Sequence, residues 1–430
     1  MKNLLISGDI GVGKSYLLRK ALERYNGSLG GFITGKDYVE GGHYIYMKSL
    51  NDFYSSVNVA HVVDGLDIYS AQVYSHQFDE YGTQFIDEAI TSRQLVVMDE
   101  IGVMERNSPK FLNSIERAFS SDKPVVGIIK NRKSPILETF KSRKDTKTLF
   151  ITGQNSDEVY NEVIHWMEKH QLSIKTKRKH EWSQKKIDMY ERALDYGKDL
   201  YPGPLLKSIF HQTNHIKDKS WLELGVGTGA FSIPIGLKSK SLTAVDTSYN
   251  MLLNFSDKIR RLNIRNSKGL LVPIELLNTD TKYDYVLSSF SGSALSHTDN
   301  LTKFIDMAKE KAFILCPADS GDYNFKGDVL ARRLHRHLKP FSGGAGPLKE
   351  QLEQLGYEYQ YTEIDFNLPQ VFNTMEECVY FFKELYGVEE DEEEILRSFV
   401  LEYLKEDQHY YVFDNHRKAG LFTIISRVSH

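Results

Sequence analysis

The stretch GDIGVGKS, Gly8 to Ser15, decides the fold that we predict for the first third of the chain. It fits the pattern G-x-x-x-x-G-K-[ST], a glycine-rich turn whose backbone N–H groups can surround phosphate oxygens. An apolar run from Leu4 to Ile6 precedes the turn, and apolar residues at helical spacing follow it. A buried strand, this turn and a helix that points its positive end at the anion together predict a phosphate site. The predicted phosphate-binding residues are Gly8, Asp9, Ile10, Gly11, Val12, Gly13, Lys14 and Ser15.

Two carboxylates follow a second apolar run in the same part of the chain. Leu95 to Met98 reads LVVM, and Asp99 and Glu100 come directly after it. A buried strand that delivers acids to its carboxyl end is suited to hold the Mg²⁺ of a bound nucleotide. We expect Asp99 and the Ser15 hydroxyl to bind Mg²⁺. The catalytic roles fall to Lys14, which would reach the β- and γ-phosphates, and to Glu100, which would orient or deprotonate the attacking water.

The run VVMDEIGVME, residues 96–105, resembles the DEIGxME stretch of the thermophile-type nucleoside-triphosphatases, the THEP family. GFIT at 31–34, the predicted strand at 124–129 and TGQNSDEV at 152–159 resemble the same family, and the resemblance extends over residues 1–168. It implies a compact P-loop NTPase of broad nucleotide tolerance, with ATP or GTP as substrate.

This stretch departs from the family pattern in two places. Residues 41–81 match poorly, and Ser156 stands where an arginine is expected. An arginine that neutralises transition-state charge is not fixed by the sequence, and the candidates for it are Arg106, Arg132 and Arg143.

The composition bounds the class of protein. At 430 residues, two or three domains are expected. The net charge of −4 provides no basic field, so nucleic acid and anionic membranes are unfavoured as partners. Two cysteines, Cys316 and Cys378, cannot form a disulfide framework or a four-cysteine zinc site, and they fit a reducing cytoplasm. Neither a signal peptide nor an apolar run long enough to span a membrane is visible, so we expect a cytoplasmic protein.

The pattern of the chain predicts two α/β domains. Residues 1–170 alternate apolar strands with helical segments, which is typical of a mostly parallel sheet with flanking helices, and the strands at 43–47 and 57–63 are candidates for an antiparallel edge. The basic, polar stretch 171–182 is predicted to be a linker, and 183–430 a second domain.

A second glycine turn lies at Trp221 to Gly229, WLELGVGTG. Its G-x-G-x-G spacing differs from the dinucleotide fingerprint G-x-G-x-x-G, and it suits a ligand without phosphate whose amino-acid end lies close to the backbone, such as S-adenosylmethionine (SAM). A strand that ends at Asp246 follows, 17 residues after the last glycine, where the acid would accept hydrogen bonds from both ribose hydroxyls. The predicted SAM-binding residues are Glu223, Gly225, Gly227, Gly229 and Asp246.

Residues 183–430 resemble a class I SAM-dependent methyltransferase, a Rossmann-like fold. The resemblance assigns 282–289 and 311–317 to the fourth and fifth strands, and 358–366 and 421–428 to an antiparallel closing pair. Helices within 187–210 would cap the SAM pocket.

Three further features of this half leave alternatives open. The aromatic segment Met375 to Tyr386 is either core or a lid over the acceptor pocket, and Glu389 to Glu394 is an exposed helix start. Cys316 is expected to be a buried structural residue. The basic face formed by Arg332, Arg333, His335, Arg336 and His337 is either solvated surface or a site for an anionic acceptor.

The sequence therefore predicts a bifunctional enzyme: Mg-dependent hydrolysis of a nucleoside triphosphate by the first domain, and SAM-dependent methyl transfer by the second. The rivals are a nucleotide-sensing regulatory module and a small-molecule or nucleotide kinase built on the same P-loop. A small molecule is favoured as the methyl acceptor, its identity is not readable from the sequence, and the oligomeric state is open.

Overall fold

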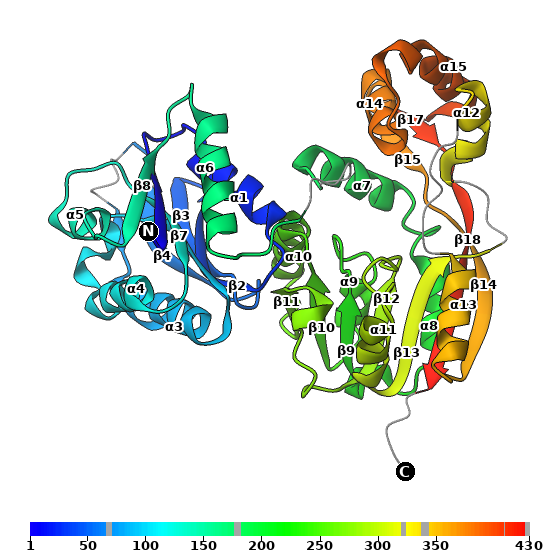
Figure 1. Cartoon of the computed structure of the whole chain (residues 1–430), viewed down its shortest axis with the longest axis horizontal. Helices are drawn as coiled ribbons and strands as arrows, with labels where there is room; N and C mark the ends of the chain where they lie inside the picture. Colours follow the sequence, from blue (N-terminus) through cyan, green and yellow to red (C-terminus); the bar gives the residue numbers. More distant parts are fainter. Residues whose placement is uncertain (66–70, 176–181, 320–323, 337–343, 408, 426–430) are drawn as a thin grey trace. The chain divides into compact units, whose positions relative to one another are not determined.

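A computed structural model of the chain describes residues 1–65, 71–175, 182–319, 324–336, 344–407 and 409–425. The chain folds as two compact units, 1–176 and 177–430, except that residues 268–276 are grouped with the first unit. Each unit is an α/β structure, as the sequence predicts (Figure 1). Within the described residues, no helix is long and apolar enough to cross a membrane.

The first unit is built on one eight-stranded sheet. Its strands are β1 (Asn3–Ser7), β2 (Leu29–Val39), β3 (Gly42–Ser49), β4 (Ser56–Val63), β5 (Gln72–Val73), β6 (Leu95–Ile101), β7 (Val125–Ile129) and β8 (Thr146–Phe150). They lie in the order β5-β4-β3-β2-β6-β7-β1-β8. The part from β2 to β8 is parallel, and β1 is flanked by β7 and β8. The glycine turn after β1 and the carboxylates after β6 therefore leave the same edge of the sheet.

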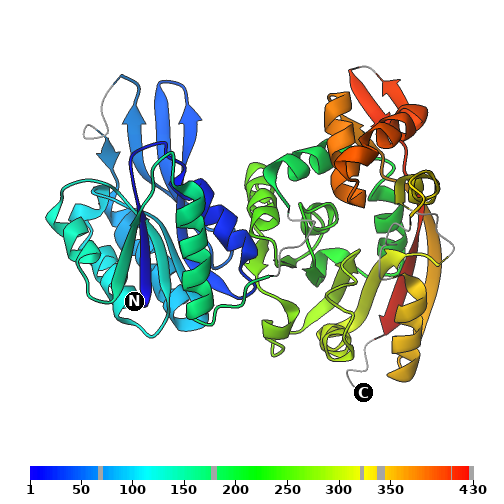
Figure 2. The ribbon, with the colours of Figure 1, turned by 45° about the horizontal axis from the view of Figure 1, so that its top comes forward.

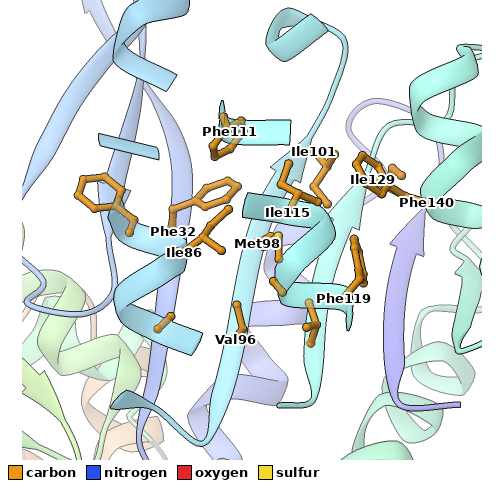
Figure 3. Close-up of a cluster of buried hydrophobic side chains, with 14 of the residues drawn as sticks. Phe32, Ile86, Val96, Met98, Ile101, Phe111, Ile115, Phe119, Ile129 and Phe140 are labelled. Atoms are coloured by element: carbon orange, nitrogen blue, oxygen red, sulfur yellow. The ribbon is translucent and has the colours of Figure 1, made fainter. Parts of the chain in front are cut away.

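Helices cover both faces of this sheet. They are α1 (Lys14–Arg24), α2 (Ser75–Gln77), α3 (Thr83–Ser92), α4 (Pro109–Ser120), α5 (Pro135–Lys141) and α6 (Ser156–Lys169). The helices α1 and α6 pack together on one face, and α3 and α4 on the other (Figure 1). The main apolar core lies between the sheet and the α3–α5 side, where Phe111 packs against Phe32 at a ring distance of 5.6 Å (Figure 3). Burial of this apolar surface fixes the parallel strands that carry the site.

The strands β2 to β5 form the antiparallel edge that the sequence predicts at 43–47 and 57–63. The first half of β2 pairs with β6, and its second half pairs with β3 alone, so the hairpin extends beyond the helix-covered part of the sheet (Figure 2). The stretch 41–81, which resembles the THEP family poorly, supplies most of this extension.

The second unit contains a seven-stranded sheet in the order β11-β10-β9-β12-β13-β18-β14. Its strands are β9 (Ser220–Leu224), β10 (Ser241–Asp246), β11 (Ser267–Leu271), β12 (Tyr283–Ser289), β13 (Ala308–Pro317), β14 (Tyr359–Asn367) and β18 (His416–Ile425). The strands β10, β9, β12 and β13 are parallel, and β18 inserts antiparallel between β13 and β14. If the seven strands are numbered by their order along the chain, their order across the sheet is 3-2-1-4-5-7-6, and the seventh strand is antiparallel. The predicted class I methyltransferase fold and its closing pair are confirmed; residues 426–428 of the predicted last strand lie outside the described residues.

The remaining elements of the second unit flank this sheet or form a small lobe at one end of it. The helices are α7 (Gln184–Tyr196), α8 (Gly203–His211), α9 (Ser232–Gly236), α10 (Tyr249–Arg261), α11 (Thr298–Asp306), α12 (Gly327–Arg333), α13 (Ala345–Gln354), α14 (Met375–Tyr386) and α15 (Glu393–Tyr403). The lobe combines α12, α14 and α15 with a three-stranded antiparallel sheet (Figure 1). The strands of that sheet are β15 (Gln370–Phe372), β17 (Tyr410–Phe413) and β16 (Leu404–Asp407).

The segment predicted as a linker, 171–182, is in part ordered on the first unit. The backbone N–H of Lys175 donates to the carbonyl of Arg24 at 2.8 Å, and Leu172 is buried. Residues 176–181 lie outside the described residues. The separation between the units is therefore placed later in the chain than residue 170.

We expect trypsin to cut the full chain first after Lys177, Arg178 or Lys179, because each unit has its own sheet and its own core. Both fragments should keep a cooperative thermal unfolding transition, with the cut located by mass spectrometry. Early cleavage elsewhere, or a fragment that loses its transition on cleavage, would contradict this division.

Candidate functional sites

The glycine turn after β1 has the geometry of a phosphate site. Gly8 has φ +152°, and a Cβ there would collide with the carbonyl oxygen of Ile151, so glycine is required for this close approach. Gly13 precedes α1 and no side chain caps the helix, so its first N–H groups face the turn without a partner inside the helix. The Lys14 ammonium donates to the carbonyls of Gly8, at 3.0 Å, and Asp9, at 2.6 Å, which holds its charge over the turn.

The first unit brings the predicted metal ligands together. The Ser15 hydroxyl donates to the Asp99 carboxylate across 3.3 Å, joining the start of α1 to the end of β6. Asp99 is 2% exposed. Burial raises the pKa of Asp99 to about 7, assisted by Glu100, while Arg19, the Ser15 hydrogen bond and Lys14 oppose the rise. A carboxylate so poorly solvated gains most from a divalent cation, and a hydroxyl and a carboxylate are oxygen donors of the kind that Mg²⁺ prefers.

Glu100 is less buried than Asp99 and stands beside a lysine. Its carboxylate lies 3.9 Å from the ammonium of Lys130, which follows β7. The structure therefore places the predicted water-activating group at the same strand ends as the P-loop, with a cation from the neighbouring strand to hold it.

Glu105 is a site residue that the sequence analysis missed. It is 5% exposed, one of its oxygens accepts from the Gly102 N–H at 3.1 Å, and the other has no hydrogen-bond partner within the described residues. Burial raises the pKa of Glu105 to about 7, and Lys130 and Glu100 both act on it. It thus fastens the turn after β6, which begins next to Glu100 in the sequence. The sequence signal for Glu105 was the final E of DEIGVME. Strand periodicity could not identify its role, because Glu105 lies after the strand.

The structure bears on one of the three arginine candidates directly. Arg143 pairs with Asp145, at 3.0 Å, and with Glu116, so its charge is already matched. Arg106 is exposed in the short turn after β6, and Arg132 lies just beyond β7. Arg19 was not considered, yet its charge lowers the pKa of Asp99 more than that of Lys14 does. It lies four residues after Ser15 on α1, on the same face of the helix, and this spacing could have identified it.

The second glycine turn follows β9 in the second unit. Gly225, Gly227 and Gly229 all have positive φ, and a Cβ on Gly225 would collide with the side chain of Ser291 in the loop after β12. The turn therefore lies against the end of the neighbouring strand, at the point where the strand order of the sheet reverses. Open α/β sheets bind ligands at this position.

Glu223 is fully buried beneath this turn. Its oxygens accept hydrogen bonds from the hydroxyls of Ser232 and of Ser289, the latter at 2.6 Å. Burial raises the pKa of Glu223 to about 7, opposed by both serines. The carboxylate therefore holds the turn between α9 and β12, and its predicted contact with SAM stays a prediction.

Asp246 ends β10 opposite the turn. One carboxylate oxygen accepts from the Gly227 N–H at 2.9 Å, and the other accepts from the Ser248 N–H at 2.8 Å. The ribose contact stays a prediction, and the structure adds that Asp246 also fixes the glycine turn.

A cavity of about 480 Å³ lies beside the turn, within the second unit. Trp182, α7, the loop after β12, the end of β13 and the lobe line it. Among the described residues, eight aromatic side chains line it: Trp182, Tyr190, Tyr201, Phe290, Phe325, Phe366, Tyr380 and Phe381. Its volume is that of a pocket for one small molecule. The predicted capping helices within 187–210 contribute Met189, Tyr190 and Tyr201 to this wall and its margin.

The aromatic segment that the sequence left open is the helix α14, which packs in the core of the lobe and also lines the cavity. Its role as a lid over an acceptor stays a prediction. Cys378, Val379 and Phe382 face the apolar core of the lobe. Tyr380 and Phe381 line the cavity. Cys316 is buried as predicted, and burial raises the pKa of its thiol to about 12. The acidic run begins a short helical turn at Glu390–Glu392 that leads into α15.

The basic face around α12 was predicted to be either solvated surface or an anion site, and the structure pairs its arginines with acidic side chains. Arg336 pairs with Glu392 at 2.7 Å, Arg333 pairs with Glu402, and Arg332 pairs with Asp328 at 3.0 Å. Arg333 and Arg336 connect α12 and the residues after it to the acidic α15 region, whereas Arg332 pairs within α12 itself. His335 follows the helix, and His337 lies outside the described residues.

Glu105→Gln is expected to change how the stability of the first unit depends on pH. Between the ordinary pKa of 4.5 and the raised value of about 7, the native carboxyl holds a proton that the unfolded chain has lost. Stability therefore falls as the pH rises through this window, and a neutral amide avoids the loss. The variant should be more stable than the parent at about pH 8, on the order of 1–3 kcal/mol, and equal to it near pH 5. Urea unfolding at both pH values measures this, with the exposed Glu40→Gln as control. A variant that is less stable than the parent at both values would contradict it.

The sequence of the first unit matches known nucleoside-triphosphatases. A family model described as NTPase matches residues 3–164. The nucleoside-triphosphatase THEP1 of Thermotoga sp. strain RQ2 is 31% identical over 163 residues, 37% of this chain and 92% of the relative.

Among solved structures, the magnesium protoporphyrin IX methyltransferase of Synechocystis is similar with a TM-score of 0.36 and 11% identity, covering 56% of this chain and 94% of the other. A phosphoethanolamine N-methyltransferase of Haemonchus contortus is similar with a TM-score of 0.40 and 14% identity, covering 79% and 88%. The methyltransferase fold itself is read from the strand order of the second sheet. Through its first unit, with its P-loop and its Asp99–Glu100 pair, the chain belongs to the THEP1 family of nucleoside-triphosphatases.

Proposed function

We propose that the first unit hydrolyses a Mg-bound nucleoside triphosphate at the turn between β1 and α1. The observation that carries this is the juxtaposition of Lys14 and Ser15 with Asp99, whose oxygen lies 3.3 Å from the Ser15 hydroxyl. The turn amides and Lys14 bind the phosphates, and Arg19 adds a second positive charge on the same helix. The kinase alternative differs in its acceptor: hydrolysis without an added metabolite supports the NTPase.

Ser15 and Asp99 would hold Mg²⁺, because they supply a hydroxyl and a buried carboxylate on one side of the phosphate turn. A bound Mg²⁺ neutralises charge on the β- and γ-phosphates. Glu100 accepts a proton from the attacking water or orients it, and Lys130 and the turn fastened by Glu105 keep its carboxylate in place.

Glu100→Gln should slow hydrolysis by a factor of about 10²–10⁴ while nucleotide binding stays near that of the parent, because only the interaction with water is lost. Phosphate release and titration of a nonhydrolysable analogue measure the two effects. Lys14→Ala should weaken both, since a phosphate contact disappears. The exposed Glu80→Gln is the control, and turnover of Glu100→Gln at the parent rate would overturn the assigned role.

We propose further that the second unit binds SAM at the turn between β9 and α9 and transfers its methyl group to a small molecule in the adjacent cavity. Support comes from three glycines with positive φ, from Asp246 at the end of β10, and from a cavity at the strand ends. In the transfer the sulfur–methyl bond breaks, its electron pair stays on sulfur, and a lone pair of the acceptor forms the new bond. The products are S-adenosylhomocysteine and the methylated acceptor, which releases a proton if its nucleophile carried one.

Methyl transfer from SAM needs no nucleotide energy. The two activities are therefore proposed as separate reactions on one chain, and hydrolysis serves another step or acts as a slow switch. Turnover of each reaction with and without the other ligand separates these two roles.

Asp246→Ala should weaken binding of S-adenosylhomocysteine by one to a few powers of ten. Up to two charge-assisted hydrogen bonds to the ribose are lost, each worth about 1.5–3 kcal/mol, and about 1.4 kcal/mol corresponds to a tenfold change. Asp246→Asn keeps part of the acceptor capacity and should lose less. Calorimetric titration of the full chain measures both, with the exposed Asp280→Ala as control and circular dichroism to confirm folding. Unchanged affinity in folded Asp246→Ala would contradict the assignment.

A further inference from the structure

The aromatic cavity beside the second glycine turn contains an arginine whose charge is matched by no acidic group among the described residues. Arg417 lies near the start of β18, opposite Phe366 of β14, and lines the cavity. Within the described residues it forms no ion pair and no hydrogen bond; the groups that act on its charge are the phenols of Tyr386 and Tyr201. Burial lowers the pKa of Arg417, but an arginine stays protonated in a protein. The cavity therefore carries a positive charge.

The other two charged side chains of the described wall, Lys186 and Glu384, form an ion pair with each other. Lys186 of α7 donates to Glu384 of α14 at 3.1 Å, and both line the cavity. Gln370 lies 4% exposed on β15, and within the described part of the chain its side-chain amide has no hydrogen-bond partner. An uncompensated cation and a free amide in one apolar cavity are costly for the folded protein, so a ligand that matches them is the simplest reason for both.

The arginines outside the cavity show the contrast. Arg192 lies a short distance along α7 and makes two hydrogen bonds to the Glu377 carboxylate, at 2.6 and 3.1 Å. Arg336 makes two such bonds to Glu392. Both residues serve the fold. Arg417 has no comparable carboxylate among the described residues, so the anionic acceptor site that the sequence suggested near α12 is better placed here.

We infer that the methyl acceptor is a small organic anion, with a flat or otherwise apolar body against the aromatic wall and a carboxylate or phosphate on Arg417. This inference rests on the proposed methyl transfer and names its substrate class. Arginine presents a planar fork that matches either anion in two hydrogen bonds, and Gln370 offers a further donor. The aromatic rings contribute apolar contact and stacking.

Two rival occupants are disfavoured by the same residues. Aromatic walls also bind ammonium cations, but a cation here would face Arg417 without a free carboxylate, because Glu384 is paired with Lys186. An acceptor that needs a strong base is disfavoured too. The wall has no histidine among the described residues, and the phenol of Tyr190, with its pKa raised by burial to about 12, stays neutral. The acceptor must therefore bring a nucleophile that is reactive at neutral pH.

Four matched probes test this on the full chain by calorimetric titration: 1-naphthoate, 1-naphthyl phosphate, neutral 1-naphthamide and the cation (1-naphthylmethyl)trimethylammonium. At least one of the two anions should bind at least about tenfold tighter than the amide. The anion that binds more tightly shows whether the site prefers a carboxylate or a phosphate. Arg417→Met should reduce that anion to the level of the amide, Arg417→Lys should restore part of the preference, and the paired surface variant Arg332→Met should change nothing.

The stability of Arg417→Met separates a ligand role from a structural one. Removal of an unmatched, half-buried charge should leave the unfolding midpoint unchanged or higher. The inference is overturned if neither anion binds at millimolar concentration, or if the amide or the cation binds as tightly as the anions. It is also overturned if Arg417→Met still prefers the anion. A titration with S-adenosylhomocysteine on the same preparation distinguishes the two proposals. If this ligand binds and the anions do not, only the substrate class is contradicted. If this ligand does not bind, the proposed methyl transfer is contradicted.

Discussion

Both units depend on one constraint: a buried parallel strand must reverse into a helix through a turn that only glycine can make. At Gly8 the carbonyl of Ile151 excludes a side chain, and at Gly225 the side chain of Ser291 does so. The close approach that forbids a Cβ also exposes backbone N–H groups at the carboxyl edge of the sheet, where neighbouring strands deliver their acids. Asp99 reaches Ser15 in the first unit, and Asp246 reaches the Gly227 N–H in the second.

In each unit a buried carboxyl holds a loop near the predicted site. Glu105 fastens the turn after β6, and Glu223 is held between Ser232 and Ser289 under the second glycine turn. Burial raises the pKa of each to about 7. Such groups reduce stability at neutral pH, and the structure uses them where a loop must be held in one position.

The elements that the sequence predicts well are those with local signals. Strand, glycine turn and helix lie within a few residues of each other, so the P-loop and the strands that carry Asp99 and Asp246 could be predicted directly. The closing pair of the second sheet was predicted only through the resemblance to methyltransferases. The role proposed for Arg417 could not be predicted from the sequence. It depends on the absence of an acidic partner among the described residues, which becomes visible only when β14, β18 and the lobe are brought together. The arginines near α12 show the reverse case: their clustering in sequence suggested an anion site, but their partners Glu392 and Glu402 lie on a later segment that packs against them.

The central claim is that one chain carries two distinct ligand sites of this kind, and calorimetry on the full chain tests it most directly. The chain is first saturated with Mg-ADP and then titrated with S-adenosylhomocysteine, and the order is reversed in a second run. The account predicts one site for each ligand, with neither ligand displacing the other. Displacement of one ligand by the other, or no binding of S-adenosylhomocysteine to folded protein, would contradict it.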